Sequence, residues 1–291
     1  MKKIILAESA GVCFGVERAL KKSYEVTDKS NGEVYSLGPI IHNPQVVKHL
    51  EEKGVKVIGR LEDAPGGTVM IRAHGVPVGT LSTLKERGLS VVDLTCPIVK
   101  KLQHSVKKLA EEGYFVVIVG DKRHPEIIGA MSYADPESVT VVESKLELEE
   151  GVFTKKKVGI VAQTTIAFDR FREVVDTFLE RSVEEIKVFN TICDDIFNKQ
   201  REAVEIAKSV DVMIVIGGKN SSNTTKIAKL CHEVNPNTYQ IETIDEVHSL
   251  GLDLNEKTIG VTAGASTPSW IIEEILRGLK EGKEKGDKKG I

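Results

Sequence analysis

Short apolar runs alternate along this chain with longer segments that have helical periodicity. The runs at 114–119 and 212–216 are almost wholly apolar and are followed by glycine, as buried strands often are. The segments at 97–113 and 194–209 repeat apolar residues every three or four positions, which is typical of an amphipathic helix. This alternation predicts an α/β fold with mostly parallel sheets.

Three cysteines give this alternation a repeat of about 97 residues. Cys96 follows Cys13 by 83 residues, and Cys193 follows Cys96 by 97 residues. Each of the three ends a short extended segment and directly precedes a helical pattern. The chain is therefore expected to hold three α/β units of similar layout, and Cys231 falls outside the series.

Polar residues recur at matching places of the three units. His42, His124 and Ser221 lie 28 or 29 residues after the three cysteines, each in a loop behind a predicted strand. Later strands end in AHG, AQTT and AGAST. Parallel α/β sheets bind ligands beyond the carboxyl ends of their strands, so units packed around an approximate threefold axis would direct these loops toward one central site.

Composition excludes several classes of protein. The chain has 291 residues, of which 41% are hydrophobic and 29% are charged, so it is not disordered or fibrous. Its formal net charge of -3 gives no support for a nucleic-acid partner. The apolar runs are too short to span a membrane and no secretory signal is evident, which predicts a cytoplasmic protein with reduced cysteines.

The three cysteines suggest a metal centre of a particular kind. Zinc fingers and zinc ribbons usually bind their metal through closely spaced pairs of cysteines, and this chain has no CxxC. Three thiolates can instead hold a [4Fe-4S] cluster by three of its irons and leave the fourth iron open to a substrate oxygen. The histidines could be metal ligands, proton carriers or phosphate donors. Glu126 could relay protons near an open metal site.

Two alternatives remain open at this point. The same cysteines and histidines could form a zinc or mononuclear-metal hydrolase, since zinc accepts both ligand types. The chain could also be a non-catalytic binding module for phosphorylated metabolites, with its cysteines merely buried. The P-loop pattern and GxGxxG are both absent, so a nucleotide site lacks its usual support.

Nine segments, taken together and in this order, resemble the LytB family of reductases. The resemblance spans roughly residues 4–275. The segments are GVCFGVERA, GPIIHNPQVV, RAHGVP, DLTCPIVKK, GDKRHPEIIG, AQTT, NTIC followed by NKQREAV, GGKNSSNTTKIA and AGASTPSWII.

The resemblance implies a pseudo-threefold cloverleaf of three α/β domains around one [4Fe-4S] cluster. Its ligands would be Cys13, Cys96 and Cys193, with one iron open. Because the family packs its N-terminal strand with the third domain, the expected domains are 14–95, 96–190, and 1–13 with 191–280. A charged flexible tail is expected at 281–291.

The implied activity is the reductive dehydroxylation of 4-hydroxy-3-methylbut-2-enyl diphosphate to isopentenyl and dimethylallyl diphosphate, the last step of the non-mevalonate (methylerythritol phosphate) pathway. Glu126 would be the catalytic proton donor, and ferredoxin or flavodoxin would supply electrons. Thr165, in preference to Thr164, would hydrogen-bond near Glu126 and the substrate hydroxyl. The implied substrate-binding residues are His42, His74, His124, Thr165, Ser221, Ser222, Asn223 and Ser266.

One segment departs from the family pattern. After the third cysteine the family commonly has an alanine-threonine stretch, whereas this chain has Asp194, Asp195, Ile196 and Phe197. A polar substrate contact is therefore in doubt there. Cys231 matches no ligand position and is interpreted as a spare helix thiol.

Overall fold

The computed structural model describes residues 3–148, 155–181, 183–251, 254 and 256–281. The chain divides into two compact units, Phe14–Phe197 and Met1–Cys13 with Asn198–Ile291. Within the described ranges no helix is both long enough and apolar enough to cross a membrane.

The first sheet of the unit Phe14–Phe197 has four parallel strands in the order β3-β2-β4-β5. Its core includes Tyr35, Val69, Ile71 and Leu84. The strands are β2 (Val34–Leu37), β3 (Val55–Ile58), β4 (Thr68–Ile71) and β5 (Ser90–Asp93), and the helices of this half are α1 (Phe14–Lys29), α2 (Pro44–Glu52) and α3 (Val78–Glu86).

The second sheet of the same unit has the order β7-β6-β8-β9 and is also parallel throughout. Its central strands are buried on both faces, which explains their continuous apolar runs. The strands are β6 (Phe115–Val119), β7 (Val139–Val142), β8 (Lys157–Ala162) and β9 (Glu185–Phe189). The helices α4 (Pro97–Glu111) and α5 (Pro125–Met131) cover one face, and α7 (Phe168–Leu179) covers the other.

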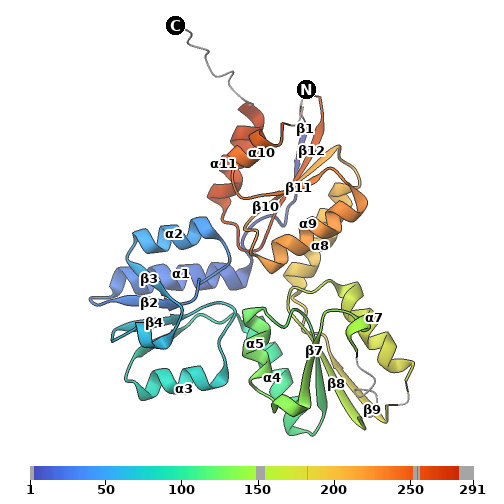
Figure 1. Cartoon of the computed structure of the whole chain (residues 1–291). Helices are drawn as coiled ribbons and strands as arrows, with labels where there is room; N and C mark the ends of the chain where they lie inside the picture. Colours follow the sequence, from blue (N-terminus) through green and yellow to red (C-terminus); the bar gives the residue numbers. More distant parts are fainter. Residues whose placement is uncertain (1–2, 149–154, 182, 252–253, 255, 282–291) are drawn as a thin grey trace. The chain divides into compact units, whose positions relative to one another are not determined.

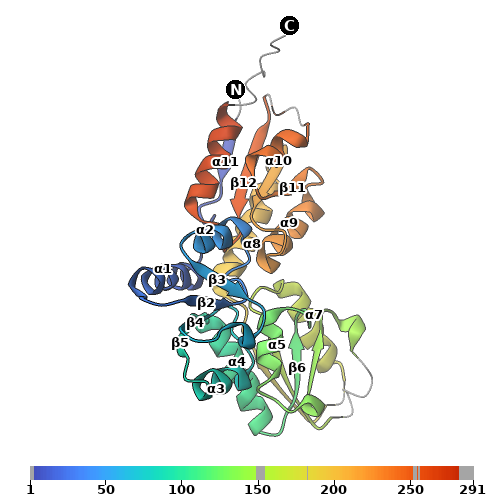
Figure 2. The same cartoon turned by 60° about the vertical axis from the view of Figure 1, so that its left-hand side comes forward.

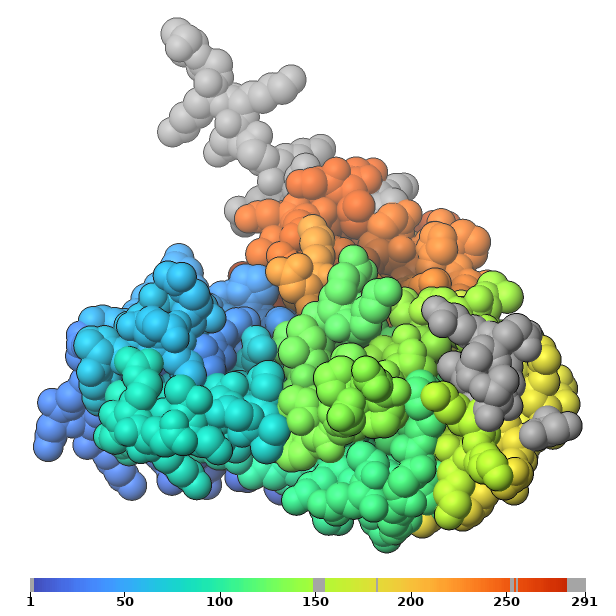
Figure 3. All heavy atoms as spheres, turned by 60° about the horizontal axis from the view of Figure 1, so that its bottom comes forward, coloured from blue at the N-terminus to red at the C-terminus, as the bar shows by residue number. Residues whose placement is uncertain are grey.

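The two halves of this unit touch where α3 begins. The backbone N–H of Val78 donates to Oγ of Ser132 at 2.9 Å. Figure 3 shows the teal atoms of the first half packed directly against the green atoms of the second half. This contact joins the two halves within the unit Phe14–Phe197.

The unit Met1–Cys13 with Asn198–Ile291 contains the third parallel sheet, in the order β1-β12-β10-β11. Figure 2 shows helices on both of its faces, α8 and α9 on one and α10 and α11 on the other. The strands are β1 (Lys3–Leu6), β10 (Val212–Ile216), β11 (Thr238–Ile241) and β12 (Thr258–Ala263), and the helices are α8 (Asp194–Ala207), α9 (Ser222–Val234), α10 (Ile244–Ser249) and α11 (Ser269–Glu281).

All three sheets have the same strand order. The first strand of each, β2, β6 or β10, lies between the second and the third, and the fourth place is taken by β5, β9 or β1. The N-terminal strand thus completes the last sheet by pairing with β12, Ile4 opposite Ile259. Three repeated parallel sheets confirm the α/β fold class and the repeat predicted from the sequence.

The predicted domain boundaries and pseudo-threefold arrangement stay predictions. The charged tail predicted at 281–291 lies outside the described residues, apart from Glu281.

Candidate functional site

The shared strand order explains where the predicted site residues lie. In each sheet the chain runs from the first strand outward to the second and then crosses back to the third on the other side of the first, so the first and third strands are neighbours. Parallel sheets of this kind bind ligands beyond the carboxyl ends of these two strands, where the direction changes. Every residue predicted to contact substrate follows one of them. These are His42 after β2, His74 after β4, His124 and Glu126 after β6, Thr165 after β8, Ser221, Ser222 and Asn223 after β10, and Ser266 after β12.

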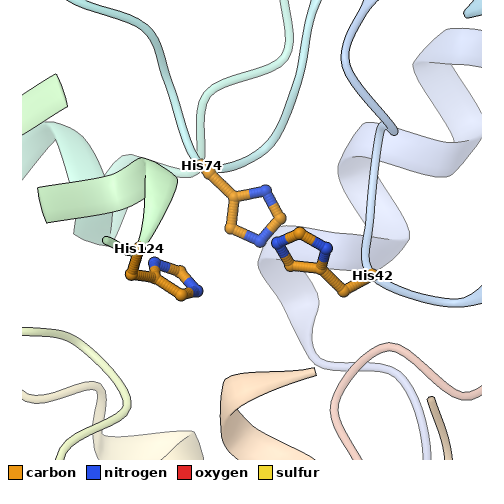
Figure 4. Close-up of side chains that lie close together, drawn as sticks. All are labelled: His42, His74 and His124. Carbon is orange, nitrogen blue, oxygen red and sulfur yellow. The ribbon is translucent and has the colours of Figure 1, made fainter. Parts of the chain in front are cut away.

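The structure brings together the three histidines of the unit Phe14–Phe197. Ring centroids are 4.3 Å apart for His42 and His74, 5.4 Å for His74 and His124, and 5.8 Å for His42 and His124. One ring nitrogen of each lies within 4.8 Å of the corresponding nitrogens of the others. Figure 4 shows the rings turned toward one another from three loops. We refer to His42, His74 and His124 as the histidine cluster.

The histidine cluster is uncharged at neutral pH. Burial is the largest effect on each ring and lowers all three pKa values, that of His124 to about 4 and that of His74 well below the ordinary value of 6.5. The positive charge of Arg72 lowers each of them further. The imidazoles therefore act as neutral hydrogen-bonding groups rather than as cations.

A helix cap determines which nitrogen of His124 carries the proton. His124 is the N-cap of α5, and its Nδ1 accepts the backbone N–H of Glu126 at 3.2 Å. An accepting Nδ1 carries no proton, so the neutral ring has its proton on Nε2. Nε2 is buried and has no hydrogen-bond partner among the described residues. His124 therefore presents a donor, which suits a phosphate oxygen and not a cation.

Glu126 is a buried carboxyl group held by one neighbour. It is 2% exposed at the second residue of α5. The backbone N–H of Thr164 donates to Oε1 at 2.7 Å, and the Thr164 hydroxyl donates to Oε2 at 2.8 Å. Burial raises the pKa of Glu126 from 4.5 to about 7, although the two bonds from Thr164 oppose the shift. Near neutral pH this group can both give and accept a proton.

The sequence predicts that Thr165, in preference to Thr164, hydrogen-bonds near Glu126, and in the structure Thr164 is bonded to this carboxylate. Thr164 makes both hydrogen bonds, because the turn after β8 directs the N–H and the hydroxyl of this residue at the carboxylate. Thr165 is half-buried in the same turn. Its predicted contact with the substrate stays a prediction.

The raised pKa of Glu126 predicts a pH dependence of stability. The folded protein holds this proton more tightly than the unfolded chain, so stability falls as pH rises from about 4.5 through about 7. A shift of this size corresponds to at most about 3 kcal/mol. Glu126→Gln cannot ionise, so relative to the unmodified protein it should gain stability between pH 4.5 and pH 8. Anaerobic urea unfolding at both pH values measures this, and an equal difference at both would contradict it.

Each of the three predicted metal-ligand cysteines directly precedes a helix. Cys13 precedes α1, Cys96 is the N-cap of α4, and Cys193 precedes α8. All three are partly buried, and none of them forms a disulfide within the described residues. The positive end of a helix dipole stabilises a thiolate, so this placement suits cysteines that bind metal.

Cys193 has a thiol whose pKa is clearly shifted by its surroundings. Burial raises the pKa of its thiol, and the backbone N–H groups of Asp195 and Ile196 lower it. The negative charge of Cys96 also raises it, so these two sulfur atoms lie within electrostatic range of each other. A positively charged metal centre would offset both the cost of burying a thiolate and the repulsion between the two thiolates.

The segment before Cys13 is held by residues that the sequence analysis did not single out. Glu202 of α8 accepts the backbone N–H groups of Glu8 at 2.7 Å and Ser9 at 3.0 Å, and it also accepts the Ser9 hydroxyl. The buried ammonium group of Lys199 donates to the Ser9 carbonyl. Carboxylates that bind backbone groups fix loop shape, so these residues position the approach to Cys13.

The departure from the family pattern has a packing role. The ring of Phe197 meets the ring of Phe168 edge to face, with centroids 5.7 Å apart. Such pairs stabilise contacts beyond the area that they bury. Phe197 therefore joins the start of α8 to α7.

Residues after β10 form a second polar group, in the unit Met1–Cys13 with Asn198–Ile291. Ser221 is the N-cap of α9, and its Oγ accepts the Thr224 hydroxyl at 3.0 Å and the Ser266 hydroxyl at 3.4 Å. Asn223 is buried, and neither Nδ2 nor Oδ1 has a hydrogen-bond partner among the described residues. Buried amides are normally satisfied, so Asn223 is a candidate ligand contact at a helix start that favours anions.

Comparison with known proteins agrees with this picture. Residues 4–280 match the family model described as LytB protein. The chain is 49% identical over 279 residues to the 4-hydroxy-3-methylbut-2-enyl diphosphate reductase of Geobacter metallireducens, covering 96% of this chain and 97% of that protein. It is 46% identical over 283 residues to the protein of the same name from Aquifex aeolicus, covering 97% of each.

Two solved structures have the same fold. The E-1-hydroxy-2-methyl-but-2-enyl-4-diphosphate reductase from Plasmodium falciparum matches with a TM-score of 0.85 at 28% identity, covering 95% of this chain and 87% of that one. A structure of (E)-4-hydroxy-3-methyl-but-2-enyl diphosphate reductase, the terminal enzyme of the non-mevalonate pathway, matches with a TM-score of 0.71 at 44% identity, covering 97% and 100%. The chain belongs to the LytB family.

Proposed function

We propose that this chain reduces 4-hydroxy-3-methylbut-2-enyl diphosphate to isopentenyl and dimethylallyl diphosphate, the last step of the non-mevalonate pathway. Full-length relatives carry the reductase name. The observation that carries the proposal is the buried Glu126, whose pKa is about 7 and whose backbone N–H is bonded to a histidine of the cluster. A proton donor beside a group of neutral donors suits an anionic substrate that loses a hydroxyl group.

Membership of the LytB family implies an iron–sulfur cluster cofactor. We infer that it is a [4Fe-4S] cluster held by Cys13, Cys96 and Cys193, with one iron open. Three partly buried thiols at helix starts fit such a cluster in ligand type and number. When bound, the cluster supplies electrons and a Lewis-acidic position for the substrate oxygen.

The protein side chains account for binding and for proton movement. The diphosphate accepts hydrogen bonds from the histidine cluster and from Ser221, Ser222, Asn223 and Ser266, while Thr165 contacts the substrate near Glu126. The reaction consumes two electrons and two protons, breaks the allylic C–O bond, forms one C–H bond and releases water. Glu126 provides the proton that the leaving oxygen takes, and a second proton goes to carbon. Thr164 holds both carboxylate oxygens in place during this transfer.

The alternative of a zinc hydrolase fits the histidine cluster poorly. Histidines that bind zinc usually donate their second N–H to a carbonyl or carboxylate group. In His124 the second nitrogen accepts an N–H instead, so the free nitrogen carries a proton. The alternative of a binding module assigns no task to a proton-active Glu126. Both observations favour the reductase.

An anaerobic assay tests the proposal. Cluster-loaded protein, reduced methyl viologen and 4-hydroxy-3-methylbut-2-enyl diphosphate should yield both isoprenoid diphosphates, identified by mass spectrometry. Ferredoxin or flavodoxin, proposed as the natural donor, should replace the viologen. A protein with four irons per chain that forms neither product would refute the proposed function.

A further inference from the structure

Arg72 lies between two loops that carry histidines of the cluster. It directly follows β4 and precedes His74 by two residues, and its Nε donates to the carbonyl of Gly75 at 3.4 Å. On the other side it lies against Gly38, which follows β2. A Cβ atom at Gly38 would come within 2.7 Å of an Arg72 terminal nitrogen, and Gly38 also has a φ of +74°. Glycine at position 38 thus makes room for the guanidinium group.

Among the residues that the structure describes, no carboxylate forms an ion pair with the guanidinium group of Arg72. The carboxylates Glu25, Asp28 and Glu33 of the same unit are each within 4 Å of a lysine instead. Asp121, which influences His124, is instead within 3.5 Å of Arg123. Partial burial lowers the pKa of Arg72, yet arginine remains charged at any physiological pH. A partly buried, unpaired cation is costly unless an anion occupies the site.

The influence of Arg72 extends over the whole histidine cluster. Its charge lowers the pKa of His42, His74 and His124 alike. Because the rings are neutral, they offer hydrogen bonds but no net charge to a ligand. A diphosphate group carries several negative charges, which neutral donors alone do not balance.

We propose that Arg72 is a further binding residue for the diphosphate group, supplying the positive charge that the neutral histidine cluster lacks. This inference rests on the proposed function. Arginine suits the role because its guanidinium group binds phosphate oxygens through parallel hydrogen bonds. The bond to Gly75 uses Nε and leaves the terminal nitrogens for a ligand.

Calorimetric titration of inorganic pyrophosphate into the cluster-loaded protein tests the inference. Arg72→Gln removes the charge but retains an amide N–H that can donate to the carbonyl of Gly75. Arg72→Lys retains the charge but lacks the planar guanidinium group with its parallel N–H donors. Arg60→Met, at an exposed arginine, is the control for net charge. Arg72→Gln should weaken binding by about 10-fold or more. Arg72→Lys should recover most of that loss, and Arg60→Met should bind as the unmodified protein does.

A second readout separates charge from loop shape. Pyrophosphate affinity should fall more steeply with salt in the unmodified protein than in Arg72→Gln. In turnover, Arg72→Gln should raise KM by a similar factor and change kcat much less. Unchanged pyrophosphate affinity in Arg72→Gln, or equal losses in the Gln and Lys variants, would overturn the role of charge. A protein that binds pyrophosphate through Arg72 but reduces no substrate would overturn the proposed function alone.

Discussion

Glu126→Gln is expected to lower kcat by about 10²–10⁴-fold while leaving the cluster in place. The glutamine fills the same volume and can still accept the N–H of Thr164, but it cannot release a proton. The loss should therefore appear in kcat more than in KM. Anaerobic steady-state kinetics, with iron and sulfide content measured on the same samples, provide the comparison.

Two further variants make this expectation specific. Glu137→Gln removes an exposed carboxylate that follows α5, the helix that carries Glu126, and the activity of this variant should be unchanged. Thr164→Val removes the hydroxyl bond that lowers the pKa of Glu126, so that pKa should rise above about 7 and the alkaline limb of the pH–rate profile should move to higher pH. A Glu126→Gln enzyme with nearly full activity would refute the role of Glu126 as proton donor.

Replacing Cys96 or Cys193 by serine is expected to remove both the cluster and the activity. An intact protein should contain about four irons and four sulfides per chain, as one [4Fe-4S] cluster requires. With two thiolate ligands the cluster should be lost or degraded, and its visible absorbance should disappear. Iron and sulfide analysis of anaerobically purified protein measures this directly.

Cys231 provides the matched control. Cys231 belongs to α9, and its thiol is fully buried in the core that α9 shares with α8 and β10. Burial raises its pKa to about 12, so it stays protonated and inert. Cys231→Ala should retain the full cluster and lose only some stability. Stoichiometric zinc without sulfide in the unmodified protein would contradict the cluster and revive the hydrolase alternative. An active Cys96→Ser protein without a cluster would contradict the cysteine assignment.

The sequence by itself determined the repeat, the parallel α/β character of the sheets and the candidate loops. Strand and helix patterns are local, and the spacing of Cys13, Cys96 and Cys193 sets the register of the three units. Because strand ends in a parallel sheet carry the ligand loops, residues such as His42 and Ser221 could be selected without coordinates. The amphipathic pattern that follows each of these cysteines likewise predicts that a helix begins there.

Only the tertiary structure decided which side chains meet. Thr164 and Thr165 are adjacent and chemically alike, so the direction of the turn after β8 had to choose between them. Arg72 looks like an ordinary charged residue at a strand end, and only the structure places it against Gly38, which follows a different strand. The protonation of His124 and Glu126 depends on burial and on a capping bond. Such contacts join residues far apart in the chain, and local sequence patterns do not encode their geometry.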